Sequence, residues 1–148
     1  MSETLWFTDT RMRVHVAEEA QSLVEGQARR GNMPPLHVHH GDDETFYCLD
    51  GRMSLITAKG TVELAAGDAA FAPRGVPHTY RVESDEARWL VATTDAGFGT
   101  FVRAASVPAE NGGYAPDELM PPPERLGALA AEQGIELLGP PGALPAGA

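Results

Sequence analysis

Two histidines and a glutamate lie close together in one glycine-bounded stretch, Gly31 to Gly51, which reads GNMPPLHVHHGDDETFYCLDG. Successive side chains of a β-strand alternate between its two faces, so His37 and His39 project to the same side. Glu44 follows a turn rich in glycine and aspartate and begins the next strand, which brings its carboxylate back beside the two imidazoles. The stretch therefore predicts two neighbouring strands that present three metal-binding side chains on one face.

Short segments with strand character, separated by turn residues, run through most of the chain. We predict strands over residues 5–17, 21–30, 36–40, 44–49, 53–58, 61–65, 69–73, 78–83, 88–94 and 98–103. Asp50-Gly51 and Lys59-Gly60 are typical hairpin turns. About ten strands, spaced roughly 8–12 residues apart and without a helix among them, indicate an all-β sandwich or barrel.

The character of the sequence changes after residue 105. Residues 106–116 are polar and rich in glycine, which predicts a connector, and a further short helix fits around residues 116–119. Proline in the first turn and Gly134 after the last turn predict a helix over residues 123–133. The last ten residues, GPPGALPAGA, contain little that could pack, so we predict a loose tail.

Chain length indicates the number of domains, and composition excludes some classes of binding partner. The 148 residues suffice for one domain with its own core, in which we expect a β-barrel over 1–105 and a connector, helix and flexible tail over 106–148. The net charge of −10 disfavours nucleic acid and anionic membranes as partners. With Cys48 as the single cysteine, no signal-peptide pattern and no membrane-spanning run, we expect a cytoplasmic protein.

A third histidine comes from a second stretch, GDAAFAPRGVPHTYRV, in which His78 begins a strand. Three imidazoles and one carboxylate suit Fe, Ni, Mn, Cu or Zn better than Ca or Mg. Four protein ligands leave two positions of an octahedral ion for water, substrate or oxygen, as a catalytic site requires. We therefore expect one divalent transition metal per chain, held by His37, His39, Glu44 and His78.

The two stretches resemble the two sequence motifs of the cupin superfamily. The first motif is matched by Gly31, His37, His39, Glu44 and Gly51, and the second by Gly67, Pro73, Gly75 and His78. Residues 52–66 separate the motifs, the short spacing of compact single-domain cupins. Val82 departs from the family pattern, which often has asparagine at this position of the pocket wall. The resemblance implies a cupin jelly-roll β-barrel (a double-stranded β-helix) with a short C-terminal helical extension.

The resemblance also implies an activity. Similarity to quercetin dioxygenase-like cupins implies a metal-dependent dioxygenase acting on a small aromatic, polyketide or flavonol-like molecule. Similarity to cupin-type polyketide cyclases implies the alternative of a non-redox, zinc-dependent cyclase or isomerase, and a cupin that only binds a small ligand is a second alternative. In the enzymatic interpretations Glu44 and Tyr80 are the candidate catalytic residues, both as carriers or donors of a proton. Cupins of this size are commonly homodimers, and we expect one here.

Several further side chains have two interpretations each. Four share the strand face of the predicted ligands and are candidates for either the substrate pocket or core packing: Phe46, Cys48, Tyr80 and Val82. His40 has the opposite parity to the ligands, so we expect it to point outward or to support a ligand from behind, the alternative being a fifth metal ligand. Arg74 either meets an anionic group at the pocket mouth or is solvated. The predicted helix over 123–133 either covers the barrel opening or packs on the outer sheet.

Overall fold

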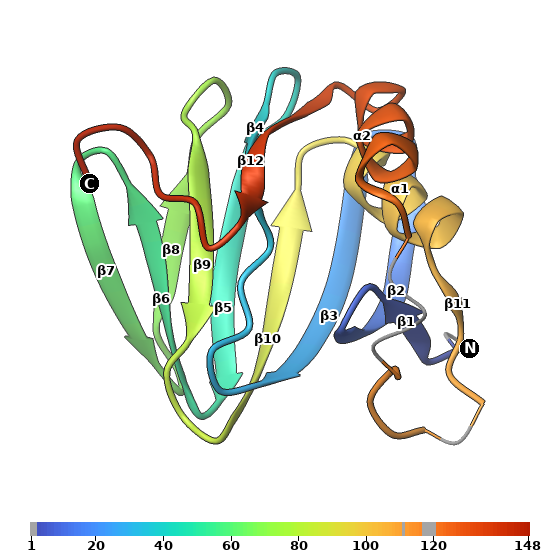
Figure 1. The fold of residues 1–148 in the computed structure, drawn as a ribbon, viewed down its shortest axis with the longest axis horizontal. Coiled ribbons are helices and arrows are strands. Elements are labelled where there is room, and N and C mark those ends of the chain that lie inside the picture. Colours follow the sequence, from blue (N-terminus) through green and yellow to red (C-terminus); the bar gives the residue numbers. More distant parts are fainter. Residues whose placement is uncertain (1–2, 111, 117–120) are drawn as a thin grey trace.

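The structure, a computed structural model, describes residues 3–110, 112–116 and 121–148 and consists of two antiparallel sheets with two short helices (Figure 1). In chain order the elements are β1 (Leu5–Phe7), β2 (Thr10–Glu18), β3 (Gln21–Arg29), β4 (Pro35–His39), β5 (Glu44–Asp50), β6 (Arg52–Thr57), β7 (Gly60–Ala65), β8 (Ala69–Ala72), β9 (His78–Val82), β10 (Glu86–Thr93), α1 (Gly97–Ala105), β11 (Val107–Pro108), α2 (Pro123–Ala131) and β12 (Ile135–Pro141). The larger sheet has the order β11-β1-β2-β3-β10-β5-β8 and the smaller one β12-β4-β9-β6-β7.

Alternation of buried and exposed side chains explains why these segments form strands. Along β5, Glu44, Phe46 and Cys48 are buried, whereas Thr45 and Tyr47 between them are exposed. A sheet with one face in the core and one in water requires this period of two. The predicted all-β jelly-roll fold is confirmed.

The hydrophobic core has two parts. One is formed mainly by strands of both sheets and includes Phe46, Met53, Leu64, Tyr80 and Trp89. The other lies beneath the helices and includes Val14, Val24, Phe101, Leu126 and Ile135. Figure 1 shows α1 and α2 together at one end of the molecule, where α1 contacts β2 and β3. This arrangement gives one end of the jelly roll a helical cover.

The last predicted strand is in fact helix α1, so that prediction was wrong. Its apolar residues Phe98, Phe101 and Val102 follow the three- and four-residue spacing of a helix, and they pack on the core beneath the helices. The carboxylate of Asp95 accepts a hydrogen bond of 2.7 Å from the first backbone N–H of the helix. Within the described part of the chain, no helix has the length and hydropathy needed to cross a membrane.

The C-terminal residues also differ from expectation. Helix α2 ends two residues earlier than predicted, and Gly134, with φ of 73°, turns the chain into β12. β12 pairs with β4 as far as Pro141, so the predicted loose tail was wrong for residues 139–141. The glycine and prolines there are tolerated because the register shifts on both sides of Gly139. Of the short helix predicted around residues 116–119, positions 117–119 lie outside the described residues.

Candidate metal centre

Four side chains with metal-binding atoms converge from both sheets. His37 and His39 lie on β4 and His78 begins β9 in the smaller sheet, whereas Glu44 begins β5 in the larger one. One ligand atom from each of the four residues lies within 4.8 Å of every other. His37 is 9% exposed, and His39, Glu44 and His78 are 1–2% exposed. The predicted ligands are therefore neighbours in a site shielded from water.

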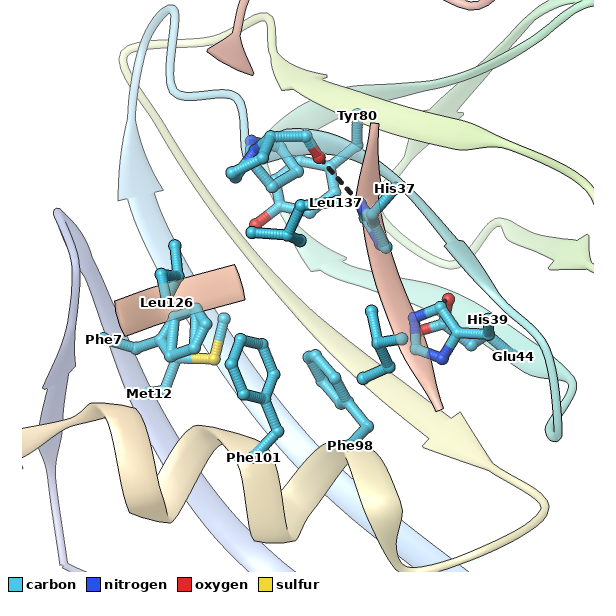
Figure 2. A pocket seen from close by; sticks show the side chains of 13 residues that line it. Phe7, Met12, His37, His39, Glu44, Tyr80, Phe98, Phe101, Leu126 and Leu137 are labelled. Atoms are coloured by element: carbon cyan, nitrogen blue, oxygen red, sulfur yellow. Dashed lines mark hydrogen bonds and ion pairs between the residues drawn. The ribbon is translucent and has the colours of Figure 1, made fainter. Parts of the chain in front are cut away.

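Backbone carbonyls orient two of the three imidazoles. The Nδ1 of His37 lies 2.7 Å from the carbonyl oxygen of Pro35, a contact drawn in Figure 2, and the Nδ1 of His78 lies 3.1 Å from that of Val76. A carbonyl oxygen only accepts, so each Nδ1 carries the donated proton. This tautomer leaves the Nε2 lone pair of both rings available to a metal.

His39 lies between two carboxylates. Its Nδ1 is 2.9 Å from Oδ1 of Asp42, and its Nε2 is 2.9 Å from Oε1 of Glu44. The same Oε1 lies 2.8 Å from Nε2 of His78. Sequence reasoning missed Asp42, because an aspartate in a turn is usually exposed. Asp42 follows His39 by three residues, and a tight turn can bring two such side chains into contact. This spacing could have indicated the interaction.

The donor atoms of this cluster fit a bound cation. Nε2 of His39, Nε2 of His78 and Oε1 of Glu44 are buried and make no hydrogen bond of acceptable geometry, despite the short distances between them. Buried polar atoms of this kind require another partner. Nitrogen and oxygen ligands about 2.1 Å from one ion and at right angles would be about 3 Å apart, close to the observed separations. The site residues therefore fit a divalent transition metal.

The three ligands with shifted pKa values carry different charges in the metal-free site. Burial, together with the electrostatic effect of the neighbouring His78, lowers the pKa of His37 to about 3, so this ring is neutral at pH 7. Burial also disfavours the charged form of His39, but its contacts with Asp42 and Glu44 outweigh burial and raise its pKa to about 10. For Glu44 the contacts with both histidines likewise outweigh burial and hold its pKa well below the usual value. The protonated ring of His39 thus supplies positive charge beside Glu44 when no cation is bound.

An apolar cavity of about 50 Å³ adjoins three of the four candidate ligands (Figure 2). His37, His39 and Glu44 contribute to its lining, and its apolar walls come from β1, β2, both helices and β12, chiefly Phe7, Met12, Phe98, Phe101, Leu126 and Leu137. The ring of Phe98 lies 5.9 Å from that of His39, centroid to centroid. The walls therefore keep the candidate metal centre in contact with hydrocarbon rather than with water.

Of the four predicted pocket residues, only Tyr80 lines this cavity. Phe46, Cys48 and Val82 are 0–2% exposed and pack in the core cluster that contains Trp89. They share the strand faces of the ligands but lie farther along those strands, where core packing replaces the cavity. Phe46 still contacts His78, with ring centroids 6.0 Å apart.

The hydroxyl of Tyr80 is hydrogen-bonded to Thr10, and burial raises the pKa of this phenol. Tyr80 therefore stays protonated at neutral pH, and its phenol can donate or accept a hydrogen bond without ionising.

Two further residues discussed from the sequence lie at the surface. Arg74 contacts the carboxylate of Asp43 through Nε at 3.2 Å, so it joins the turn before β5 to the loop before β9. His40 points outward as predicted, and its Nε2 lies 2.9 Å from Oε1 of Glu136 on β12. Neither side chain is among the residues that line the cavity.

Comparison with known proteins finds a family match and a curated relative. Residues 27–93 match the family model described as the cupin domain. The quercetin 2,3-dioxygenase of Bacillus subtilis (strain 168) is 30% identical over 88 residues, which are 60% of this chain and 26% of that protein. The chain thus spans about a quarter of the length of this relative.

Solved structures share the fold over a similar part of the chain. TT1209 from Thermus thermophilus is 32% identical, with a TM-score of 0.55 over 59% of this chain and 84% of that one. KdgF from Halomonas sp. has a TM-score of 0.55 at 17% identity, over 58% and 78% of the two chains. The polyketide cyclase RemF from Streptomyces resistomycificus has a TM-score of 0.52 at 24% identity, over 63% and 72%. The likeness to KdgF and RemF shows the shared fold alone.

Proposed function

The chain belongs to the cupin superfamily, and we propose that it is a metal-dependent enzyme acting on a small, largely apolar organic molecule. The observation that supports this most strongly is the convergence of three imidazoles and Glu44 on one buried point beside an apolar cavity. One divalent ion of Fe, Ni, Mn, Cu or Zn per chain suits this donor set.

His37, His39, Glu44 and His78 would hold the metal. A bound ion supplies Lewis acidity toward an enol or phenol oxygen of the substrate and, if it is redox-active, electron transfer with O2. Glu44 is ionised because its pKa is low, so its carboxylate can bind the metal and accept a hydrogen bond from a substrate hydroxyl, although the same low pKa makes it a weak base. Tyr80 remains a phenol and can donate a hydrogen bond to a substrate oxygen. The apolar walls exclude water, which strengthens every polar interaction inside.

Within this class we propose dioxygenation of an aromatic or flavonol-like molecule. The likeness to a quercetin 2,3-dioxygenase over 88 residues supports this choice. The cavity lining adds a second argument, since the described residues that form it include no Lys or Arg that would select an anionic substrate. A metal acting only as Lewis acid would instead support cyclisation or isomerisation, and a protein that binds ligand without turnover would be a carrier or sensor.

The size of the cavity bears on how substrate enters. A volume of about 50 Å³ is well below the roughly 300–1,000 Å³ of typical small-molecule sites. A flavonol therefore needs the walls to move apart. The wall residues Phe98, Leu126 and Leu137 come from α1, α2 and β12, the part of the fold that covers the site.

Two measurements test the proposal. Elemental analysis of protein purified without chelator is expected to find about one transition-metal ion per chain. Dissolved oxygen is then followed with quercetin and with polyketide-like phenols, in air and under nitrogen. Oxygen consumption with product supports the dioxygenase, whereas zinc with product under nitrogen supports the cyclase. Protein that neither retains nor binds a transition metal would contradict the enzyme class as a whole.

Cytoplasmic location and the homodimer stay predictions. The mass of the particle in solution, measured by light scattering during gel filtration, tests the homodimer directly: about twice the 15.7 kDa of the chain is expected.

A further inference from the structure

The geometry points to Asp42 as a positioning residue of the metal centre, which fixes the ring orientation and tautomer of His39 and sets a negative charge behind it. This inference rests on the proposed metal site but concerns a residue outside the four candidate ligands. It is a claim about metal affinity, and so it can be tested without knowing the substrate.

The burial of Asp42 calls for an explanation. The residue lies in the turn between β4 and β5 yet is only 2% exposed, and its Oδ1 contacts Nδ1 of His39 at 2.9 Å. Its Oδ2 is buried and has no hydrogen-bond partner among the described residues. A buried carboxylate is costly unless it is paired, and the ring of His39 provides that pairing. The buried position of Asp42 is therefore explained by its interaction with His39.

The adjacent residue shows what an ordinary turn aspartate does here. The side chain of Asp43 is 28% exposed and accepts hydrogen bonds from the backbone N–H and the guanidinium of Arg74. It contacts none of the candidate ligands in the hydrogen bonds and ion pairs of the described residues. Asp42 and Asp43 thus share a turn and a charge but differ in whether they contact an imidazole of the site.

His39 also differs from the other two imidazoles in the nature of its anchor. Neutral carbonyls of Pro35 and Val76 hold His37 and His78, whereas a carboxylate holds His39. A carboxylate behind an imidazole fixes the tautomer and makes the opposite nitrogen a better metal donor. Asp42 and Glu44 together place two negative charges around the centre, which a divalent cation balances.

The experiment compares Zn²⁺ and Co²⁺ binding by metal-free wild type, Asp42→Asn and Asp43→Asn, using competition with a chelating dye. Asparagine keeps the shape of Asp42 and removes its charge. Loss of such a partner typically weakens metal affinity about 10- to 100-fold, which we expect for Asp42→Asn. Asp43→Asn makes the same charge change in the same turn and is expected to stay within about threefold of wild type. The visible spectrum of bound Co²⁺ should shift only in Asp42→Asn.

Wild-type affinity in Asp42→Asn, or an equal loss in Asp43→Asn, would overturn the inference. If wild type binds neither ion, the proposed metal site fails with it; if wild type binds both and Asp42→Asn matches it, only the role of Asp42 fails. Should Asp42→Asn not fold, nitrogen NMR of the wild-type Zn²⁺ complex decides. A proton on Nδ1 of His39 supports the inference, and metal coordination through Nδ1 contradicts it.

Discussion

His37 on β4 lies directly opposite His78 on β9, with ring centroids 4.5 Å apart. These residues come from the two separate sequence motifs, and they meet because the two strands are neighbours in the smaller sheet. Glu44 reaches the same point from the larger sheet. A metal bound here would join three strands and both sheets. We therefore expect it to affect the stability of the fold as well as catalysis.

Replacement of either histidine should abolish metal binding. His37→Ala and His78→Ala each remove one of four donors from a buried site, and we expect the metal content to fall from about one ion per chain to near zero. Elemental analysis measures this, and circular dichroism checks that the variants fold. His40→Ala is the matched control, because His40 adjoins a ligand but points outward to Glu136. Stoichiometric metal in both ligand variants would contradict the site assignment.

Removal of metal should destabilise the protein. A ligand that binds only the folded state adds about 2.7 kcal/mol when its free concentration is about 100 times its dissociation constant. We expect the midpoint of thermal unfolding to fall on treatment with a chelator and to recover when Zn²⁺ is added. His37→Ala should show no response to either treatment. An unchanged midpoint in wild type, at a metal concentration that saturates the site, would argue against coupling between metal binding and folding.

Metal binding should release a proton. The raised pKa of His39, about 10, stabilises the metal-free fold fully below the unfolded-state value of about 6.5, and this stabilisation is lost as the pH rises through about 10. A metal requires the neutral ring, so binding at pH 8 should displace about one proton, and affinity should rise up to tenfold per pH unit. Calorimetric titration with Zn²⁺ in buffers of different ionisation enthalpy measures the proton. A binding heat independent of the buffer would contradict this charge assignment.

Shortening a wall residue should enlarge the cavity at a cost in stability. Leu126→Ala removes a buried side chain of α2 and should lower the free energy of unfolding by about 2–5 kcal/mol. The same variant should bind quercetin more tightly than wild type, because less wall must move. Leu144→Ala is the control, since Leu144 is 49% exposed and its loss should cost less than about 0.5 kcal/mol. Weaker quercetin binding in folded Leu126→Ala would indicate that substrate enters elsewhere.

The strands and the set of candidate ligands could be predicted because they depend on local spacing. A period of two places His37 and His39 on one face in any strand, and the turn before Glu44 is short enough to specify its own reversal. Glycine and proline between the segments set most strand ends within one or two residues of those observed. Helix α1 could also have been predicted, since Phe98, Phe101 and Val102 show helical spacing. The segment was predicted as a strand because it follows a long series of strands.

The cavity and the environment of His39 depended on the tertiary structure. Leu126 and Leu137 reach the site only because β12 pairs with β4, about a hundred residues earlier in the chain, and no local pattern specifies that pairing. Asp42 and Asp43 are adjacent and chemically identical, yet one is buried against His39 and the other is held by Arg74. Local sequence determined which side chains share a strand face, because backbone geometry alternates them. The packing of distant segments decided which of these side chains face a cavity, a ligand or the core. The physical reason is that the burial of a residue depends on every element that surrounds it.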